Sequence, residues 1–239
     1  GWLPEFLKPE VVLDYIEQAD GILQHFGAPA DRFMPSDELK KKCLAFDLHM
    51  SQAQLKHLGT DANFDTMRKM AQFLKEHVTI LTDTNVMDVE KASHIVHYEN
   101  AAGNGQLSAA HIVWAVGRSG SRYFSQWCAQ NGIPLQNNQV DIGVRVELPA
   151  MVWEHFSKKI YEPKILYRSK AYGDTTRMFC FNERGQVVVE NTAGVLTVNG
   201  HAYVDEAKKS QNSNFALLST IRFTEPFKEP IEYARSVAG

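Results

Sequence analysis

A glycine-rich turn at residues 117–121 (GRSGS) carries the clearest chemical signal in the sequence. It follows the apolar stretch AAHIVWAV at residues 109–116 and precedes a segment of helical character at residues 123–130. Glycines let the backbone bend sharply, and the free N–H groups that open the next helix suit a phosphate or a carboxylate. A turn whose glycines serve only chain reversal has the same pattern, so both interpretations stay open.

Ser119 lies within this turn, which raises the question of a serine hydrolase. A nucleophile elbow needs the pattern G-x-S-x-G, but Ser121 stands where the last glycine belongs. No particular histidine or acid supports a nucleophile here, so the sequence disfavours hydrolase chemistry. The chain also contains neither G-x-G-x-x-G nor G-x-x-x-x-G-K-[ST], so it lacks a complete dinucleotide or triphosphate cradle.

Cysteine and histidine give weaker signals for catalysis. Cys180 is a candidate reactive thiol, although a cysteine between apolar neighbours is more often an inert core residue. His201 follows an expected turn at Asn199-Gly200, where its ring can face a cleft or water. The nine histidines form no H-x-H or H-E-x-x-H pattern, so we expect no metal site. Beyond the candidates Cys180 and His201, the sequence assigns no catalytic residue.

The first part of the chain must position these residues through helices. Apolar residues recur at a spacing of three to four over residues 11–26, between Pro9 and Gly27, which predicts a helix. A short helix is predicted within residues 36–44, behind a capping serine. A third helix is predicted over residues 61–76 because its apolar side chains lie on one side.

Beyond residue 77 the apolar period changes to two, which indicates β-strands. We expect strands at residues 78–81, 86–89, 95–98 and 109–116, with a tight turn at residues 100–105. The last of these strands is almost entirely apolar, as expected of a strand buried on both faces.

From residue 133 onward the sequence favours antiparallel β-structure. Turn residues separate six expected strands, at residues 140–148, 165–167, 176–181, 186–190, 195–198 and 215–221. Only residues 151–157 have a helical pattern. The predicted fold class is therefore α/β in the broad sense (α+β), with a mostly antiparallel, β-rich second part.

Composition restricts the class of protein. The 239 residues suffice for two domains, and the content of 44% hydrophobic and 22% charged residues is ordinary for a globular protein. A net charge of −3 argues against nucleic acid or an anionic membrane as a partner. No apolar run reaches the roughly 18 residues of a membrane span, and no export signal is recognisable. Three widely spaced cysteines without C-x-x-C favour a reducing compartment, so we expect a cytoplasmic protein.

Several motifs resemble flavoproteins. The string HIVWAVG at residues 111–117 resembles the second flavin motif of glutathione-reductase-type enzymes, in which a β-meander ends in an apolar strand closing with Ala-x-Gly. Residues 78–98 occupy the place of that meander. A closer resemblance, over nearly the whole chain, is to the bacterial FAD-dependent dehydrogenases, a family of NAD/FAD-utilising proteins. It rests on KHLGTD (56–61), AVGRSGS (115–121), VDIGVRVE (140–147), RMFC (177–180), VNGH (198–201), SNFALL (213–218) and FTEP (223–226).

This resemblance implies an FAD-dependent oxidoreductase, with NADH or NADPH as a candidate electron donor. It implies a helical connecting segment (1–60), part of a Rossmann-like FAD-binding domain (61–132), a β-rich substrate domain (133–226) and a return segment (227–239). The family's N-terminal G-x-G-x-x-G and its C-terminal Gly-Asp flavin segment are not in the sequence. We therefore expect an internal segment of a longer flavoprotein that has the rest of its own chain as partner and does not retain FAD alone.

The resemblance also implies two groups of site residues. The cofactor-binding group is Gly117, Arg118, Ser119 and Gly120. The group expected to face the flavin or a small-molecule substrate is His57, Gly59, Thr60, Asp61, Arg145, Asn199 and Asn214. Arg145 would counter a negative charge or bind an anionic substrate, and a salt bridge with Glu147 or another acid is the alternative.

Two departures and one alternative complete these expectations. After Cys180 the chain lacks the family's second cysteine and its Pro-Gly-Gly turn, which argues against a two-cysteine redox role. The main hypothesis is a substrate-domain segment of an oxidoreductase that is inactive alone. The alternative is a ligand- or protein-binding module in which flavin is structural or sensory.

Overall fold

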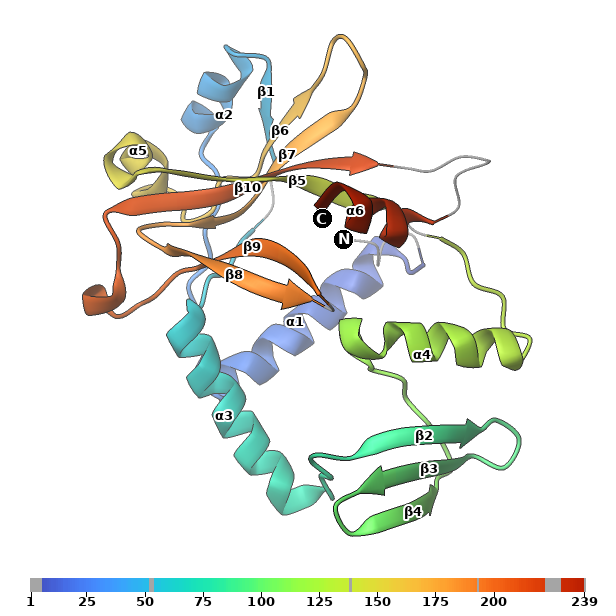
Figure 1. Cartoon of the computed structure of the whole chain (residues 1–239). Helices are drawn as coiled ribbons and strands as arrows, with labels where there is room; N and C mark the ends of the chain where they lie inside the picture. The colour runs from blue at the N-terminus through green and yellow to red at the C-terminus, as the bar shows by residue number, and fades with distance from the viewer. Residues whose placement is uncertain (1–5, 52–53, 138, 193, 222–228, 239) are drawn as a thin grey trace. The chain divides into compact units, whose positions relative to one another are not determined.

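The computed structural model describes residues 6–51, 54–137, 139–192, 194–221 and 229–238 (Figure 1). These residues form a mixed α+β fold with six α-helices, and every pair of described strands is antiparallel. No parallel sheet of the Rossmann kind is therefore present among them. The chain divides into two compact units, one of Gly1–Phe73 with Asn138–Gly239 and one of Leu74–Asn137.

Helices and short strands open the first unit, and a β-rich part completes it. Its elements are α1 (Pro9–His25), α2 (Asp37–Leu44), β1 (Leu48–Met50), β5 (Val140–Pro149), the 3₁₀ turn η2 (Ala150–Val152), α5 (Glu154–Ser157), β6 (Ile165–Arg168), β7 (Thr175–Asn182), β8 (Gln186–Thr192), β9 (Val195–His201), η3 (Glu206–Lys208), β10 (Asn212–Ile221) and α6 (Pro230–Ala238). Helix α3 (Thr60–His77) begins in this unit and ends in the second. The second unit adds β2 (Asn85–Glu90), β3 (Ile95–Asn100), β4 (Gly103–Ser108) and α4 (Gly117–Gln130).

The three helices predicted before residue 77 are confirmed as α1, α2 and α3. Pro9 occupies the first position of α1, where its missing N–H costs nothing. At the start of α2, the Ser36 hydroxyl oxygen accepts a hydrogen bond from the Leu39 N–H at 3.3 Å. This cap satisfies one of the backbone donors that a helix N-terminus leaves unpaired.

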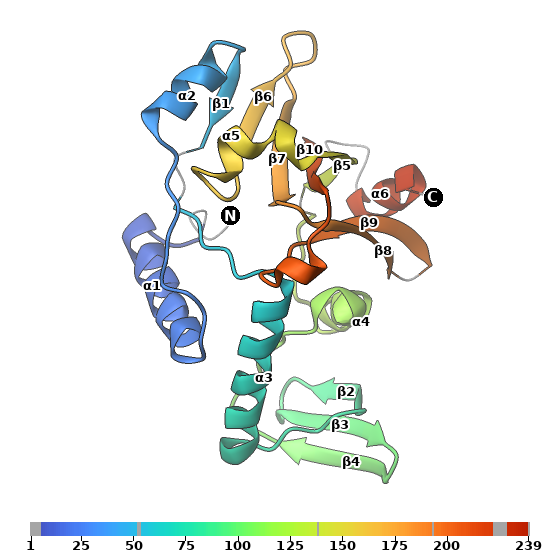
Figure 2. The same ribbon diagram turned by 90° about the vertical axis from the view of Figure 1, so that its left-hand side faces the viewer.

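A five-stranded sheet in the order β1-β6-β7-β10-β5 forms the centre of the first unit. All six strands predicted after residue 133 are confirmed, as is helical structure within residues 151–157. On one face of the sheet Phe215 packs with Phe181 and with Trp153, whose ring lies 5.0 Å from that of Phe215. Strands β8 and β9 pair only with each other among the described strands, and they contact β7 and β10 (Figures 1 and 2).

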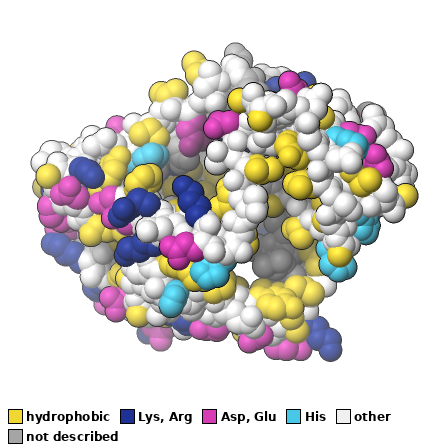
Figure 3. Space-filling model, turned by 90° about the horizontal axis from the view of Figure 1, so that it is seen from below, with side chains coloured by type: hydrophobic (Ala, Val, Ile, Leu, Met, Phe, Trp, Pro, Cys, Tyr) yellow, Lys and Arg dark blue, Asp and Glu magenta, His cyan; other side chains and the backbone are white. Residues whose placement is uncertain are grey.

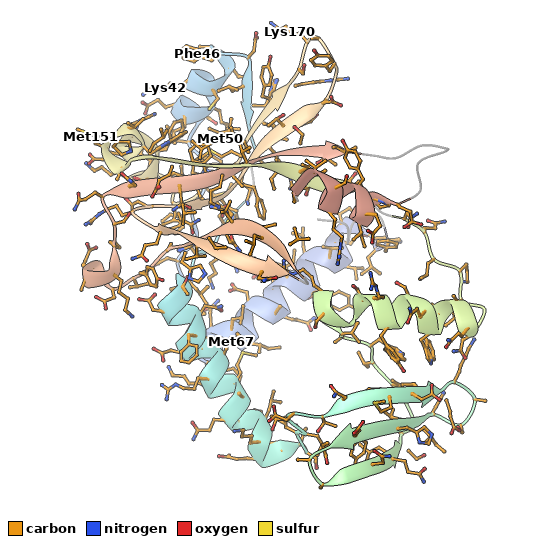
Figure 4. The ribbon with its side chains drawn as sticks, in the orientation of Figure 1. Lys42, Phe46, Met50, Met67, Met151 and Lys170 are labelled. Atoms are coloured by element: carbon orange, nitrogen blue, oxygen red, sulfur yellow. The ribbon has the colours of Figure 1, made fainter. Side chains whose placement is uncertain are left out.

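A second apolar core joins α2 to the edge of the sheet. It contains Leu39, Cys43, Met50, Phe156 and Ile160. Figure 4 labels Met50, which is 8% exposed in this core, and Phe46 just after α2, which is 77% exposed. Burial raises the pKa of the Cys43 thiol, so this cysteine is an inert packing residue.

In the second unit, β2, β3 and β4 form an antiparallel meander that precedes α4 in the sequence. Trp127 of α4 is buried with Cys128 and Val89, and its indole N–H donates to the Val89 carbonyl at 2.7 Å. The strands predicted at residues 86–89 and 95–98 are confirmed as β2 and β3. Their connection to a third strand uses a turn at Ala101-Ala102.

Two predicted strands of this unit are wrong. Residues 78–81 form no strand; they directly follow α3, and Val78 is 51% exposed. Residues 109–116 also form no strand, although Ile112 and Trp114 pack on the α4 core while Val113 between them is 88% exposed. Their in-and-out alternation is that of a strand, but no neighbouring strand in the described chain forms a ladder with them. The third strand instead is the glycine-containing β4, whose first three residues lie within the turn predicted at residues 100–105.

Many large apolar side chains are exposed in the first unit. On α1, Leu13, Tyr15, Ile16 and Ile22 are each more than half exposed, so the apolar side of this helix is largely uncovered. The space-filling view in Figure 3 shows hydrophobic side chains lying among charged ones on one face of the molecule. No helix within the described ranges is long and apolar enough to cross a membrane.

The two phenylalanines of β7 provide a test of the core. Phe181 is 1% exposed and Phe179 is 40% exposed. We expect Phe181→Ala to lower the free energy of unfolding by about 3–5 kcal/mol, because it leaves a cavity beside Phe215 and Trp153. The control, Phe179→Ala, removes ring contacts with Lys164 and Arg177 and should cost about 1 kcal/mol. Equal losses of stability in urea unfolding would contradict this assignment of the core.

Candidate functional site

A β-bulge in β7 shapes the site. The register between β7 and β10 shifts so that Cys180 and Phe181 together oppose Phe215. Cys180 adopts φ 52°, a left-handed backbone conformation that costs a non-glycine residue about 1–2 kcal/mol. Bulges re-aim the side chains that follow them, and here Asn182 becomes the direct partner of Asn214. Strained backbone of this kind often marks a binding or catalytic site.

Four polar side chains meet next to this bulge. Arg145 donates from Nη1 to the Asn214 Oδ1 at 2.8 Å and from Nη2 to the Asn199 Oδ1 at 3.3 Å. The Asn182 amide donates to the same Asn214 oxygen at 3.2 Å. Asn214 is 0% exposed and Asn182 is 4% exposed. We call Arg145, Asn182, Asn199 and Asn214 the polar cluster.

Arg145 forms no ion pair within the described residues, so the salt bridge with Glu147 considered above is absent. Its partners are the neutral amides of Asn214 and Asn199 instead. A carboxylate enters only one step further out, where the Asn199 amide donates to Glu190 at 2.9 Å. Two buried nitrogens of the cluster, Arg145 Nε and Asn214 Nδ2, have no hydrogen-bond partner among the described residues. The cluster therefore combines a positive charge with unused donors.

Gly200 lets the backbone of β9 approach the cluster closely. A Cβ atom at this position would overlap Asn182 Nδ2, Asn214 Oδ1 and Arg145 Nη1. The glycine is needed for space, because the side chains of three different strands lie where a methyl group would stand. The same backbone shields the cluster from water on that side.

The start of α3 is tied to the segment that follows β9. The Asp61 carboxylate accepts N–H hydrogen bonds from Val204 at 3.0 Å, from Asp205 at 3.0 Å and from Ala62 at 3.0 Å. The bonds from Val204 and Asp205 contribute most to lowering the pKa of Asp61 to about 2. The Thr60 N–H donates to the Ala202 carbonyl at 2.7 Å. Asp61 and Thr60 thus hold the backbone of this junction in place.

His57 lies in a half-buried stack with Tyr161. Their ring centroids are 3.7 Å apart with an interplanar angle of 19°. Burial lowers the pKa of His57 to about 4 and raises the pKa of Tyr161. The adjacent Glu162 carboxylate accepts from the Cys180 N–H at 2.9 Å and pairs with Lys164 at 3.0 Å. A chain of contacts therefore leads from the predicted residue His57 to the bulge at Cys180.

The remaining predicted residues have separate settings. Gly59 precedes α3 with φ 78°. His201 ends β9 opposite Gln186, half-buried, with its ring 6.3 Å from that of Tyr203. Cys180 is half-buried, and its sulfur lies 3.7 Å from the Asn182 amide nitrogen. The motif at residues 223–226 lies outside the described residues.

Residues 117–120 belong to the second unit, whereas the polar cluster belongs to the first. They form the first turn of α4, which begins at Gly117, six residues before the predicted helical segment. Gly117 has φ 60°, and no side chain caps the helix at Val116. The first turn also contains no acidic residue. The glycine-rich turn predicted from the sequence is thus itself helical.

Sequence reasoning missed Asn182, Tyr161 and Glu162. Asn182 stands two residues after Cys180, which was its only signal in the sequence. Because the sequence does not show the bulge, Asn182 is expected only at the end of an ordinary strand. Tyr161 and Glu162 lie between predicted elements and carry no motif. Within the described ranges, no three side chains of the His, Cys, Asp and Glu types gather where a metal ion could bind.

Comparison with known proteins adds no relative. No protein-family model matches the chain, and no curated protein matches it. The resemblance to FAD-dependent dehydrogenases therefore rests on the motifs quoted above.

Substitution of Gly200 tests whether the polar cluster is closely packed. We expect Gly200→Ala to lower the free energy of unfolding by about 1–3 kcal/mol, because the methyl group overlaps three polar side chains. The control is Gly21→Ala within α1, where nothing lies within 4 Å of the new methyl group. This control should stabilise the protein slightly through helix propensity. A Gly200→Ala protein as stable as wild type in urea would disprove the close approach of β9.

His57 predicts a dependence of stability on pH. Between pH 6.5 and about 4 the unfolded chain binds a proton that the buried ring excludes, so stability falls as the pH falls. Allowing for partial solvent contact, the loss is about 2 kcal/mol. His57→Phe keeps a ring against Tyr161 and should remove this loss, whereas His49→Phe at an exposed position should not. The free energy of unfolding of all three proteins can be measured by urea titration across this pH range. The same change of free energy with pH in all three would contradict the burial of His57.

Proposed function

We propose that this chain forms the substrate side of an FAD-dependent oxidoreductase, in which the first unit positions a small molecule against the flavin. One observation carries the proposal. Arg145, Asn199 and Asn214 come from three motifs that are far apart in the sequence, and their side chains meet in one partly buried polar cluster around the fully buried Asn214. A few convergent polar groups that are shielded from water are typical of small-molecule sites.

The residues of the chain suit a flavin only in part. The first turn of α4 offers backbone N–H groups without a side-chain cap or a nearby acid on the helix, which favours a phosphate group. The sequence contains no G-x-G-x-x-G to hold the pyrophosphate of a dinucleotide. A bound flavin would supply the electron transfer.

The contribution of this chain to such an enzyme would be binding and orientation. Arg145 offers a charge with no acidic partner among the described residues, and Asn214 fixes the guanidinium from the neighbouring strand. The β9 backbone at Gly200 keeps water from one side of these groups. Charged hydrogen bonds are stronger in such a shielded place than in water.

Absorbance spectra test this proposal. We expect flavin bands in the protein made from its complete coding sequence and none in this chain after gel filtration, with the bound flavin reduced at a catalytic rate by NADH or NADPH. Flavin bands in neither protein would overturn the proposal and favour the binding-module alternative. Flavin retained by this chain alone would contradict the expectation that it lacks the main cofactor cradle.

A further inference from the structure

We infer that the polar cluster binds the carboxylate group of a monoanionic organic acid, through Arg145 Nε and Asn214 Nδ2. The inference rests on the proposed function, because it names the class of substrate that the same site takes. Three observations support it: Arg145 has no acidic partner among the described residues, the unsatisfied buried atoms of the cluster are donors, and the cluster contains one positive charge.

Arg145 is a half-buried cation without an acidic partner among the described residues. Arg32, Arg68, Arg177 and Arg184 each form an ion pair with a carboxylate. Arg145 has no such pair within the described residues and has amide partners instead. A partly buried charge without a counter-charge is costly, and a negatively charged ligand reduces that cost.

The unsatisfied atoms of the cluster are donors. In the part of the chain that the structure describes, Arg145 Nε and Asn214 Nδ2 are buried without a hydrogen-bond partner, and Asn214 itself is 0% exposed. The oxygens are occupied: Asn214 Oδ1 accepts from Arg145 and Asn182, and Asn199 Oδ1 accepts from Arg145 and the Gly200 N–H. Both unsatisfied groups are therefore donors, and each needs an acceptor atom that the cluster does not provide.

The number of charges favours a carboxylate over a phosphate. Arg145 is the cation of the cluster, and Glu190 is linked to it through Asn199. A carboxylate matches the single positive charge of the four cluster residues, whereas a dianion would add a further negative charge near that of Glu190. A carboxylate also presents two oxygens in one plane, one for each unsatisfied donor.

Calorimetric titration of this chain with acetate, propionate and benzoate tests the inference. At least one of these monocarboxylates should bind, and benzamide and inorganic phosphate at the same concentrations should not. Arg145→Gln should weaken the binding at least about tenfold, because it removes the charge and a donor. The matched control is Arg177→Gln on β7 of the same sheet. Arg177 pairs with Asp141, and this variant should bind as wild type does.

Asn214→Asp provides a second variant in case Arg145→Gln does not fold. It replaces the unsatisfied donor with an oxygen that carries a negative charge next to Arg145, so carboxylate binding should be lost while circular dichroism shows a folded chain. Tyr161, Gly200 and the other residues of the site stay unchanged in this variant.

Three results would overturn the inference: no binding of any monocarboxylate, equal binding by wild type and a folded Arg145 or Asn214 variant, or phosphate bound as tightly as the carboxylates. None of these titrations contains flavin. A failure here with flavin bands present in the complete protein would therefore reject the carboxylate and leave the proposed oxidoreductase. Carboxylate binding without flavin bands would do the reverse.

Discussion

The arrangement of the first unit depends on the hydrogen bonds of one fully buried amide, Asn214. A buried polar group without partners costs about 1–3 kcal/mol, so the surrounding strands must supply them. Arg145 on β5 and Asn182 on β7 both donate to its oxygen, which joins the two strands that flank β10. Close approach of β9 at Gly200 then covers these groups. Register, bulge and hairpin position together supply the hydrogen bonds of the amide oxygen, while the amide nitrogen has no partner among the described residues.

The bulge at Cys180 is the local strain that this arrangement requires. Without the extra residue in β7, Asn182 would not stand opposite Asn214, and the side chains beyond the bulge would point to the opposite face. The left-handed backbone of Cys180 is held by the Glu162 carboxylate, which accepts its N–H. Glu162 follows Tyr161, the residue that stacks on His57. The strain is therefore supported from the same segments that bring the predicted residues together.

Periodicity predicts the elements of this chain well where a segment buries one face against neighbours within the chain. It found α2 and four strands of the five-stranded sheet for that reason, but it missed β1. It also found α1 and α3, although many apolar side chains of these two helices are exposed. It failed at residues 109–116, because an alternating apolar pattern indicates a strand but does not supply the neighbour that completes a ladder. For the site, motifs identified Arg145, Asn199 and Asn214 separately. Their contacts, and the role of Asn182, depend on a bulge and a register that no local pattern encodes.

The polar cluster also separates what folding needs from what function uses. A cluster built only for stability would pair Arg145 with a carboxylate, as Arg177 of β7 is paired with Asp141 of β5. Here the sheet provides two amide oxygens for the guanidinium and leaves two buried donors unsatisfied. Consistent local choices are the rule in natural folds, and departures from them concentrate at functional sites. An arginine that is held in place but not neutralised therefore has the properties of a binding group whose counter-charge comes from outside the chain.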